Sequence, residues 1–157
     1  MAADPKGLAY GNPCLLVPAP GVPVRARGLS VYDGDTITCA VVDPGSLHLR
    51  ALTVRMAGYD APEMRRSPGT KESKTEAARR IQRANDCKRQ LIAHALNKDV
   101  YLVVQGRGKY GRTIAKVYEN PNDARRQRRC INDTIATMPG CSRMNSKGRR
   151  QSGNASG

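Results

Sequence analysis

The alternation of apolar and polar residues predicts β-strands in the first third of the chain. Residues 22–32 alternate imperfectly, residues 36–42 are rich in β-branched side chains, and residues 47–56 divide into two sets that would occupy opposite faces of a strand. The intervening Asp43-Pro44-Gly45-Ser46 has the composition of a turn. We therefore expect a three-stranded meander with short connections.

A helix is predicted after this meander, where the apolar residues begin to recur at intervals of three and four. Ser73-Lys74-Thr75-Glu76 has the Ser-x-x-Glu form of a capping box, which typically opens a helix. Asn97 is suited to end it. The expected apolar stripe consists of Ile81, Ala84, Cys87 or Lys88, Leu91 and Ala95.

The second half of the chain predicts a hairpin and a short helix. Residues 100–104 and 112–118 have strand composition and lie on either side of the glycine-rich stretch 106–111. Residues 132–138 predict a helix that Pro139-Gly140 would end.

Length and composition suit one domain with tails. The chain has 157 residues, without Phe or Trp, so Val, Ile, Leu, Ala and Met must build the core, which favours a small aliphatic barrel over a large sandwich. Residues 1–21 are rich in Pro and Gly and are expected to form a flexible arm, and residues 22–142 the folded domain. Residues 143–157 are basic and polar, and we expect a disordered tail.

The charge of the chain points to a polyanionic partner. Lys and Arg total 27 against 13 acidic residues, which gives a formal net charge of +14. No apolar run has the length of a membrane span, and no basic amphipathic stretch carries the Trp and Phe of interfacial helices. We therefore expect DNA or RNA as the partner and no membrane association. Nothing in the sequence indicates oligomerisation, so a monomer is expected.

The five cysteines are expected to be reduced. They are odd in number and show neither a Cys-x-x-Cys pair nor a histidine cluster at metal-ligand spacing. The first residues lack the basic region and unbroken apolar core of a secretory signal. An intracellular location is the resulting expectation.

Three polar clusters are candidates for chemistry, and the first is Asp33-Gly34-Asp35-Thr36. Its carboxylates and hydroxyl are oxygen ligands of the kind that calcium and magnesium prefer. Gly34 allows a close approach or bulge that lets the two carboxylates converge. The alternative is structural, because Asp-Gly between strands is also a common hairpin signal.

The second cluster joins Arg55 to Asp60-Ala61-Pro62-Glu63. The proline biases Ala61 towards an extended conformation, so that its carbonyl and the Glu63 carboxylate would both be presented near Asp60. This arrangement suggests a second metal carboxylate and a candidate base. A simple acidic turn and a structural salt bridge of Arg55 remain the alternatives.

The third cluster, Lys109-Tyr110-Gly111-Arg112, places two cations and a ring on one tight turn. Taken alone it is equally a solvated hairpin tip. Together, however, the three clusters contain what phosphodiester cleavage needs: carboxylates for a metal, a carboxylate to activate water, and two guanidiniums to neutralise charge on phosphorus.

The order of these motifs resembles the staphylococcal nuclease (thermonuclease-like) family over roughly residues 22–142. The resemblance rests on Asp-Gly-Asp-Thr, Val-Arg-Met-Ala-Gly-Tyr-Asp-Ala-Pro-Glu, Lys-Tyr-Gly-Arg and Ile-Asn-Asp. It implies an α+β fold that is mainly β, a five-stranded OB-fold barrel with flanking helices. It also implies a calcium-dependent endonuclease that cuts DNA and RNA and leaves 3′-phosphates.

The resemblance also implies a role for each matching residue. One calcium ion, or another hard divalent cation, would be held by Asp35, Asp60 and the carbonyl of Ala61, with Asp33 and Thr36 in an outer position. Glu63 would activate water, and Arg55 and Arg112 would bind the scissile phosphate. The nucleotide would be contacted by Lys109, Tyr110 and Tyr118.

Four departures from the family pattern accompany this resemblance. Gly108 stands where an acidic residue is common, and Ala61 replaces a threonine. Pro139 resembles an extra residue in the helix after Ile131-Asn132, and no apolar helix follows residue 142. The alternative function is a non-catalytic module that binds nucleic acid or protein, as degenerate members of the family do. Such modules usually lose the catalytic carboxylates and arginines, and here none is lost.

Overall fold

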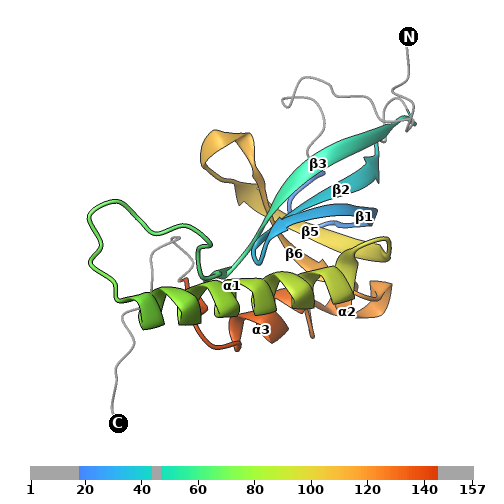
Figure 1. Ribbon diagram of the computed structural model, residues 1–157. Coiled ribbons are helices and arrows are strands. Elements are labelled where there is room, and N and C mark those ends of the chain that lie inside the picture. Colours follow the sequence, from blue (N-terminus) through green and yellow to red (C-terminus); the bar gives the residue numbers. More distant parts are fainter. Residues whose placement is uncertain (1–17, 44–46, 145–157) are drawn as a thin grey trace.

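The computed structural model describes residues 18–43 and 47–144, in which five strands close into a barrel (Figure 1). The expected arm before residue 18, part of the 43–46 turn and most of the tail lie outside the described residues. The predicted α+β, mainly β barrel is confirmed. Its strands are β1 (Pro23–Asp33), β2 (Thr36–Val42), β3 (Leu49–Met56), β5 (Asp99–Arg107) and β6 (Thr113–Tyr118).

The strands are arranged in the order β1-β2-β3-β6-β5. The predicted meander β1-β2-β3 and the predicted hairpin β5-β6 are both antiparallel and are confirmed. The barrel closes through an antiparallel β1–β5 pair and a short parallel β3–β6 pair. In the parallel pair Arg55 lies opposite Ile114, which brings the end of β3 next to the start of β6.

The barrel interior is aliphatic, as the composition predicts. Along β2 the side chains of Ile37, Cys39 and Val41 alternate inward and are almost inaccessible to solvent. They pack with other aliphatic residues of the core, which include Val54, Met56, Leu91, Val100, Leu102, Val104, Ala115, Val117 and Ile135.

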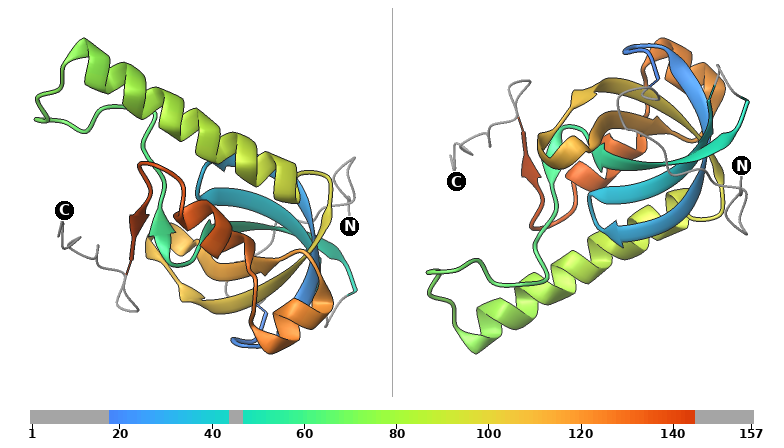
Figure 2. Two further views of the ribbon diagram at one scale, coloured as in Figure 1. Left: turned by 90° about the horizontal axis from the view of Figure 1, so that it is seen from below. Right: turned by 90° about the horizontal axis from the view of Figure 1, so that it is seen from above.

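The helix α1 (Lys74–Ala95) lies along one side of the barrel, and its N-terminal half extends beyond the barrel edge (Figure 2). Both bonds of the predicted capping box form between Ser73 and Glu76. The predicted stripe is confirmed for Ala84, Cys87, Leu91 and Ala95, which are buried. It is wrong for Ile81, which is 37% exposed. Ile81 belongs to the N-terminal half of α1, which extends beyond the barrel edge.

Two shorter helices also pack against the barrel, and both contact β6. The predicted helix after residue 131 is α3 (Ile131–Ala136), and it is fixed by Asn132, whose buried amide bonds to the backbone of Ala57, Ala115 and Val117. The helix α2 (Pro121–Arg126) was not predicted. The sequence feature that could have predicted α2 is Asn120-Pro121. The Asn120 side chain caps the helix by accepting the Asp123 N–H, and proline is favoured in the first turn of a helix.

A second, small sheet pairs β4 (Tyr59–Asp60) with β7 (Ser142–Arg143), so that Asp60 lies opposite Ser142. The turn between β5 and β6 contains a single 3-10 turn, η2 (Lys109–Gly111). Within residues 18–43 and 47–144, no helix combines the length and hydrophobicity that crossing a bilayer requires.

Candidate functional site

The turn between β1 and β2 is packed tightly against α1 and β4. The Asp33 Oδ1 accepts a hydrogen bond from the Asp35 backbone N–H at 3.0 Å, which shapes the turn. A Cβ atom on Gly34 would lie 2.7 Å from the Cβ of Cys87 and 2.8 Å from the Cβ of Ala61. Glycine is therefore required here by close approach, one of the two roles predicted for it.

The Asp35 carboxylate is largely buried and fully engaged. Its Oδ2 accepts the Ala61 N–H at 2.8 Å and lies 3.2 Å from the Arg55 Nη1, and its Oδ1 accepts the Thr36 hydroxyl at 3.2 Å. Burial nevertheless raises the pKa of Asp35 to about 6, although the charge of Arg55 opposes that rise. The negative charge of Asp35 is thus incompletely balanced by the protein, and an added cation would stabilise it.

Arg55 joins the first two predicted clusters. Its side chain, only 15% exposed, forms ion pairs with both Asp35 and Asp60. It also donates to the Asp35 carbonyl at 3.3 Å. The salt bridge that the sequence left open is present, and it joins two carboxylates from distant parts of the chain at one end of the barrel.

The donors at this point suit a hard divalent cation. Asp35 and Asp60 share one guanidinium, and the backbone of Ala61 contacts Asp35. Carboxylate and carbonyl oxygens are the ligands that calcium prefers. No group of three or more His, Cys, Asp or Glu side chains in the described part of the chain is arranged to hold a metal, so carbonyl and water oxygens would have to complete the coordination.

Glu63 follows Asp60 by three residues and is exposed to solvent. Its carboxylate accepts a hydrogen bond from the Ser67 hydroxyl at 3.1 Å, and its backbone carbonyl accepts one from Arg80. Glu63 lines the same groove as Asp60 and Ala61. This candidate base therefore shares a groove with Asp60 and is accessible to water.

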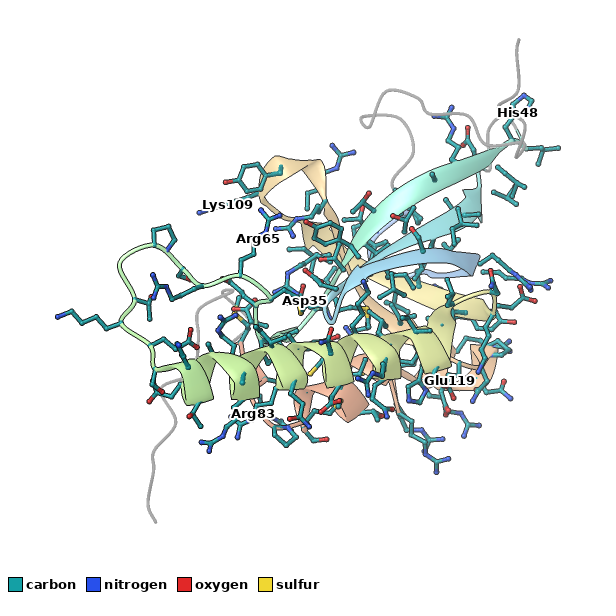
Figure 3. The ribbon with its side chains drawn as sticks, viewed as in Figure 1. Asp35, His48, Arg65, Arg83, Lys109 and Glu119 are labelled. Atoms are coloured by element: carbon teal, nitrogen blue, oxygen red, sulfur yellow. The ribbon has the colours of Figure 1, made fainter. Side chains whose placement is uncertain are left out.

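The third predicted cluster sits on the β5–β6 hairpin. Tyr110 is 93% exposed and adopts a left-handed conformation with φ of 65°. Arg112 is half-buried, and its Nε is buried without a hydrogen-bond partner among the described residues. The last residues of β3 pair with the first residues of β6, so Arg112, directly before β6, lies at the same end of the barrel as Arg55. Figure 3 shows Lys109 on the same side of α1 as Asp35.

Tyr118 is not part of this site. It lies at the other end of β6, is fully buried, and packs in a separate core cluster with Val103, Ala124 and Cys130. Its ring has no exposed surface for a nucleotide. The expected contact is wrong because α2, which supplies Ala124, covers this position.

An arginine-lined groove that the sequence did not predict extends from Asp60 and Glu63 along α1. This arginine groove has a volume of about 500 Å³. Only one of its arginines, Arg80, has an ion-pair partner among the described residues, Glu72 at 2.8 Å. Glu76, also in the groove, is engaged in the helix cap. The arginines of the groove are Arg65, Arg66, Arg79, Arg80 and Arg83.

The arginine groove forms between α1 and the loop before it, which extends from the barrel to the N-terminal end of the helix (Figure 2). Figure 3 shows Arg65 of this loop on the same side of α1 as Lys109 and Asp35. The spacing of Arg79 and Arg83 already placed them on one helix face. The position of the loop against that face depends on tertiary structure, so no local pattern in the sequence predicts it.

A larger hollow of about 720 Å³ lies on the barrel face formed by β1, β2 and β3. Its wall is mainly apolar, with Leu29, Ala40 and Ala51. The one carboxylate that lines it, Asp99, is paired with Arg25 and Arg27. This hollow therefore offers none of the chemistry found around Asp35.

Comparison with known proteins identifies the family. A family described as Staphylococcal nuclease homologue matches residues 53–150, which include Arg55, Asp60, Glu63 and Arg112. A search of curated proteins finds no match. The match covers more than half of the chain, and the closed five-stranded barrel is the fold that the resemblance implied. The chain therefore belongs to the staphylococcal nuclease homologue family.

Proposed function

We propose that this protein is a calcium-dependent nuclease that hydrolyses phosphodiester bonds of DNA, RNA or both and leaves 3′-phosphate ends. The observation that carries the proposal is the convergence of Asp35, Arg55 and Asp60 at the end of the barrel where β6 begins. Family membership alone does not establish catalysis, because domains of this family also occur in non-catalytic proteins.

Each residue of the site has a proposed part in the reaction. Asp35, Asp60 and the Ala61 carbonyl would hold the calcium ion, which when bound polarises the phosphate. The exposed Glu63 carboxylate takes the proton of the attacking water. Arg55 and Arg112 neutralise the charge that develops on the phosphoryl oxygens.

Two further groups would position the substrate. The exposed turn with Lys109 and Tyr110 contacts the neighbouring phosphate and nucleotide. On the other side of the site, the arginine groove offers guanidiniums to the sugar–phosphate backbone. These contacts are largely independent of base sequence, in keeping with a nuclease that accepts many sequences.

The experiment is cleavage of plasmid DNA and of RNA in calcium and in chelator, with the wild-type chain, Glu63→Gln and Arg112→Ala. We expect cleavage in calcium alone, and a loss of about a hundred- to ten-thousand-fold in rate for Glu63→Gln. Product ends should become extendable by a polymerase only after phosphatase treatment.

The control variants are Glu119→Gln and Arg128→Ala, which change exposed residues of the same types outside the site and should cleave normally. If all these preparations behave alike, the proposal is wrong.

A nucleic-acid-binding module is the second candidate, favoured by the arginine groove, which needs no catalysis to hold a polyanion. The two candidates differ in turnover. Tight and salt-sensitive binding in calcium without product formation would support the module and exclude the nuclease.

A further inference from the structure

Two cysteines from distant parts of the chain are in contact beside the site. The Sγ atoms of Cys87, on α1, and Cys141, directly before β7, are 3.2 Å apart, although the residues are separated by 54 positions. A disulfide bond has a length of about 2.05 Å, so the two sulfurs would have to approach by about 1 Å. Small side-chain rotations can supply a movement of that size.

We propose that Cys87 and Cys141 are the site of a reversible disulfide that cross-links α1 to the chain entering β7. The oxidant is a small-molecule disulfide such as oxidised glutathione. The Cys141 thiolate attacks it to form a mixed disulfide and releases one glutathione thiol. The Cys87 thiolate then attacks the Cys141 sulfur and releases the second glutathione thiol. In total the protein loses two electrons and two protons, and the oxidised glutathione is converted into two glutathione thiols.

The burial of the cysteines favours this pair over the others. Cys141 is half-buried, which gives a small disulfide access, and Cys87 is buried directly behind it. Cys130 is buried in a separate core cluster, and Cys39, although it belongs to the same cluster as Cys87, is fully buried. Among the described cysteines, only Cys87 and Cys141 contact each other.

The cross-link would join the elements that carry the candidate metal carboxylates. Cys87 packs against Gly34, which adjoins Asp35. Cys141 is followed by Ser142, which pairs with Asp60 across the β4–β7 sheet. Oxidation would therefore fix this edge of the site covalently, whereas in the reduced protein it is held by packing and two short strands.

The test uses the full chain equilibrated in glutathione buffers of increasing oxidised fraction and quenched with acid. We expect two of the five thiols to disappear together, with a mass decrease of two hydrogen atoms and a non-reduced digest that links the peptides of Cys87 and Cys141. The thermal midpoint should rise by several degrees on oxidation, because the bond closes a long loop in the unfolded chain.

Two variants make the result specific. Cys141→Ala changes a half-buried position, so it should fold and keep its four remaining thiols in the same buffers. Cys130→Ala should still lose two thiols. The proposal is overturned if the wild-type chain keeps all five thiols in the most oxidising buffer, or if Cys141 ends only as a glutathione adduct or paired with another cysteine. None of these readouts requires nuclease activity.

Discussion

The guanidinium of Arg55 bonds to the carboxylates of both Asp35 and Asp60, so that one positive charge balances two negative ones. Asp35 lies in the turn between β1 and β2, Arg55 near the end of β3 and Asp60 in β4, and all three side chains are mostly shielded from water. Arg55 offsets only part of the cost of burying the Asp35 carboxylate, and this deficit in compensation is the physical basis for a cation site here.

This deficit predicts that Asp35→Asn stabilises the metal-free protein at neutral pH. The folded pKa of about 6 exceeds the unfolded value near 3.8, so the folded state binds the proton more tightly and ionisation of Asp35 reduces stability as pH rises through this window. The free energy of unfolding should increase by about 1–3 kcal/mol at pH 7 and by nothing below pH 4. Chemical denaturation in chelator at both pH values measures this.

Asp99→Asn is the control of opposite sign. Hydrogen bonds from Arg25 and then Arg27 hold the pKa of Asp99 below its usual value, so its contribution to stability is present above the unfolded pKa and is lost as pH falls. This variant should therefore be slightly less stable than wild type at pH 7. A stability gain for Asp35→Asn that persists at pH 4 would contradict the explanation by ionisation.

The unpartnered Nε of Arg112 predicts that this side chain serves function more than stability. Replacement by Met, which keeps the length of the stem, should leave the free energy of unfolding within about 1 kcal/mol of wild type, because a buried unsatisfied donor is removed. Cleavage should nevertheless fall by at least about a hundredfold. A variant that unfolds, or one that cleaves at the wild-type rate, would refute this division of roles.

The arginine groove predicts a change in salt dependence. Arg79→Ala/Arg83→Ala should lower the slope of log affinity against log salt by about 1.4–1.8, because each phosphate contact contributes about 0.7 in single strands and 0.9 in duplexes. Binding is measured by fluorescence anisotropy with Glu63→Gln in the background, so that no cleavage intervenes.

The matched control removes the same charge elsewhere. Arg89→Ala/Arg128→Ala alters two exposed arginines outside the groove and should change the slope far less. Equal effects of the two double variants would mean that overall charge, and not the groove, attracts nucleic acid.

The tight packing around Gly34 predicts that Gly34→Ala destabilises the protein by about 1–3 kcal/mol, since its methyl group would overlap the Cβ atoms of Cys87 and Ala61. Gly106→Ala is the control, because a Cβ there meets no atom within 4 Å. Urea denaturation of the two variants compares them directly, and equal stabilities would show that the turn relaxes freely.

The sequence was sufficient to predict the elements that depend on local pattern. Alternation located β1 to β3, and the capping box located the start of α1 at Ser73. The error at Tyr118 followed from missing α2, since burial of one strand position depends on whether another element covers it. The arginine groove was missed because its two sides are brought together by the path of a loop, which no periodicity records.

The parallel pairing of β3 with β6 has a consequence for how the protein acquires activity. A parallel pair needs a long crossover, here containing α1 and β5, and such non-local contacts form late and slowly in folding. This contact places Arg55 opposite Ile114, at the end of the barrel where Arg112 lies. A chain still emerging from the ribosome, or one truncated before Arg112, thus carries the acidic half of the candidate site without its second guanidinium, so the site is complete only in a fully synthesised and folded molecule.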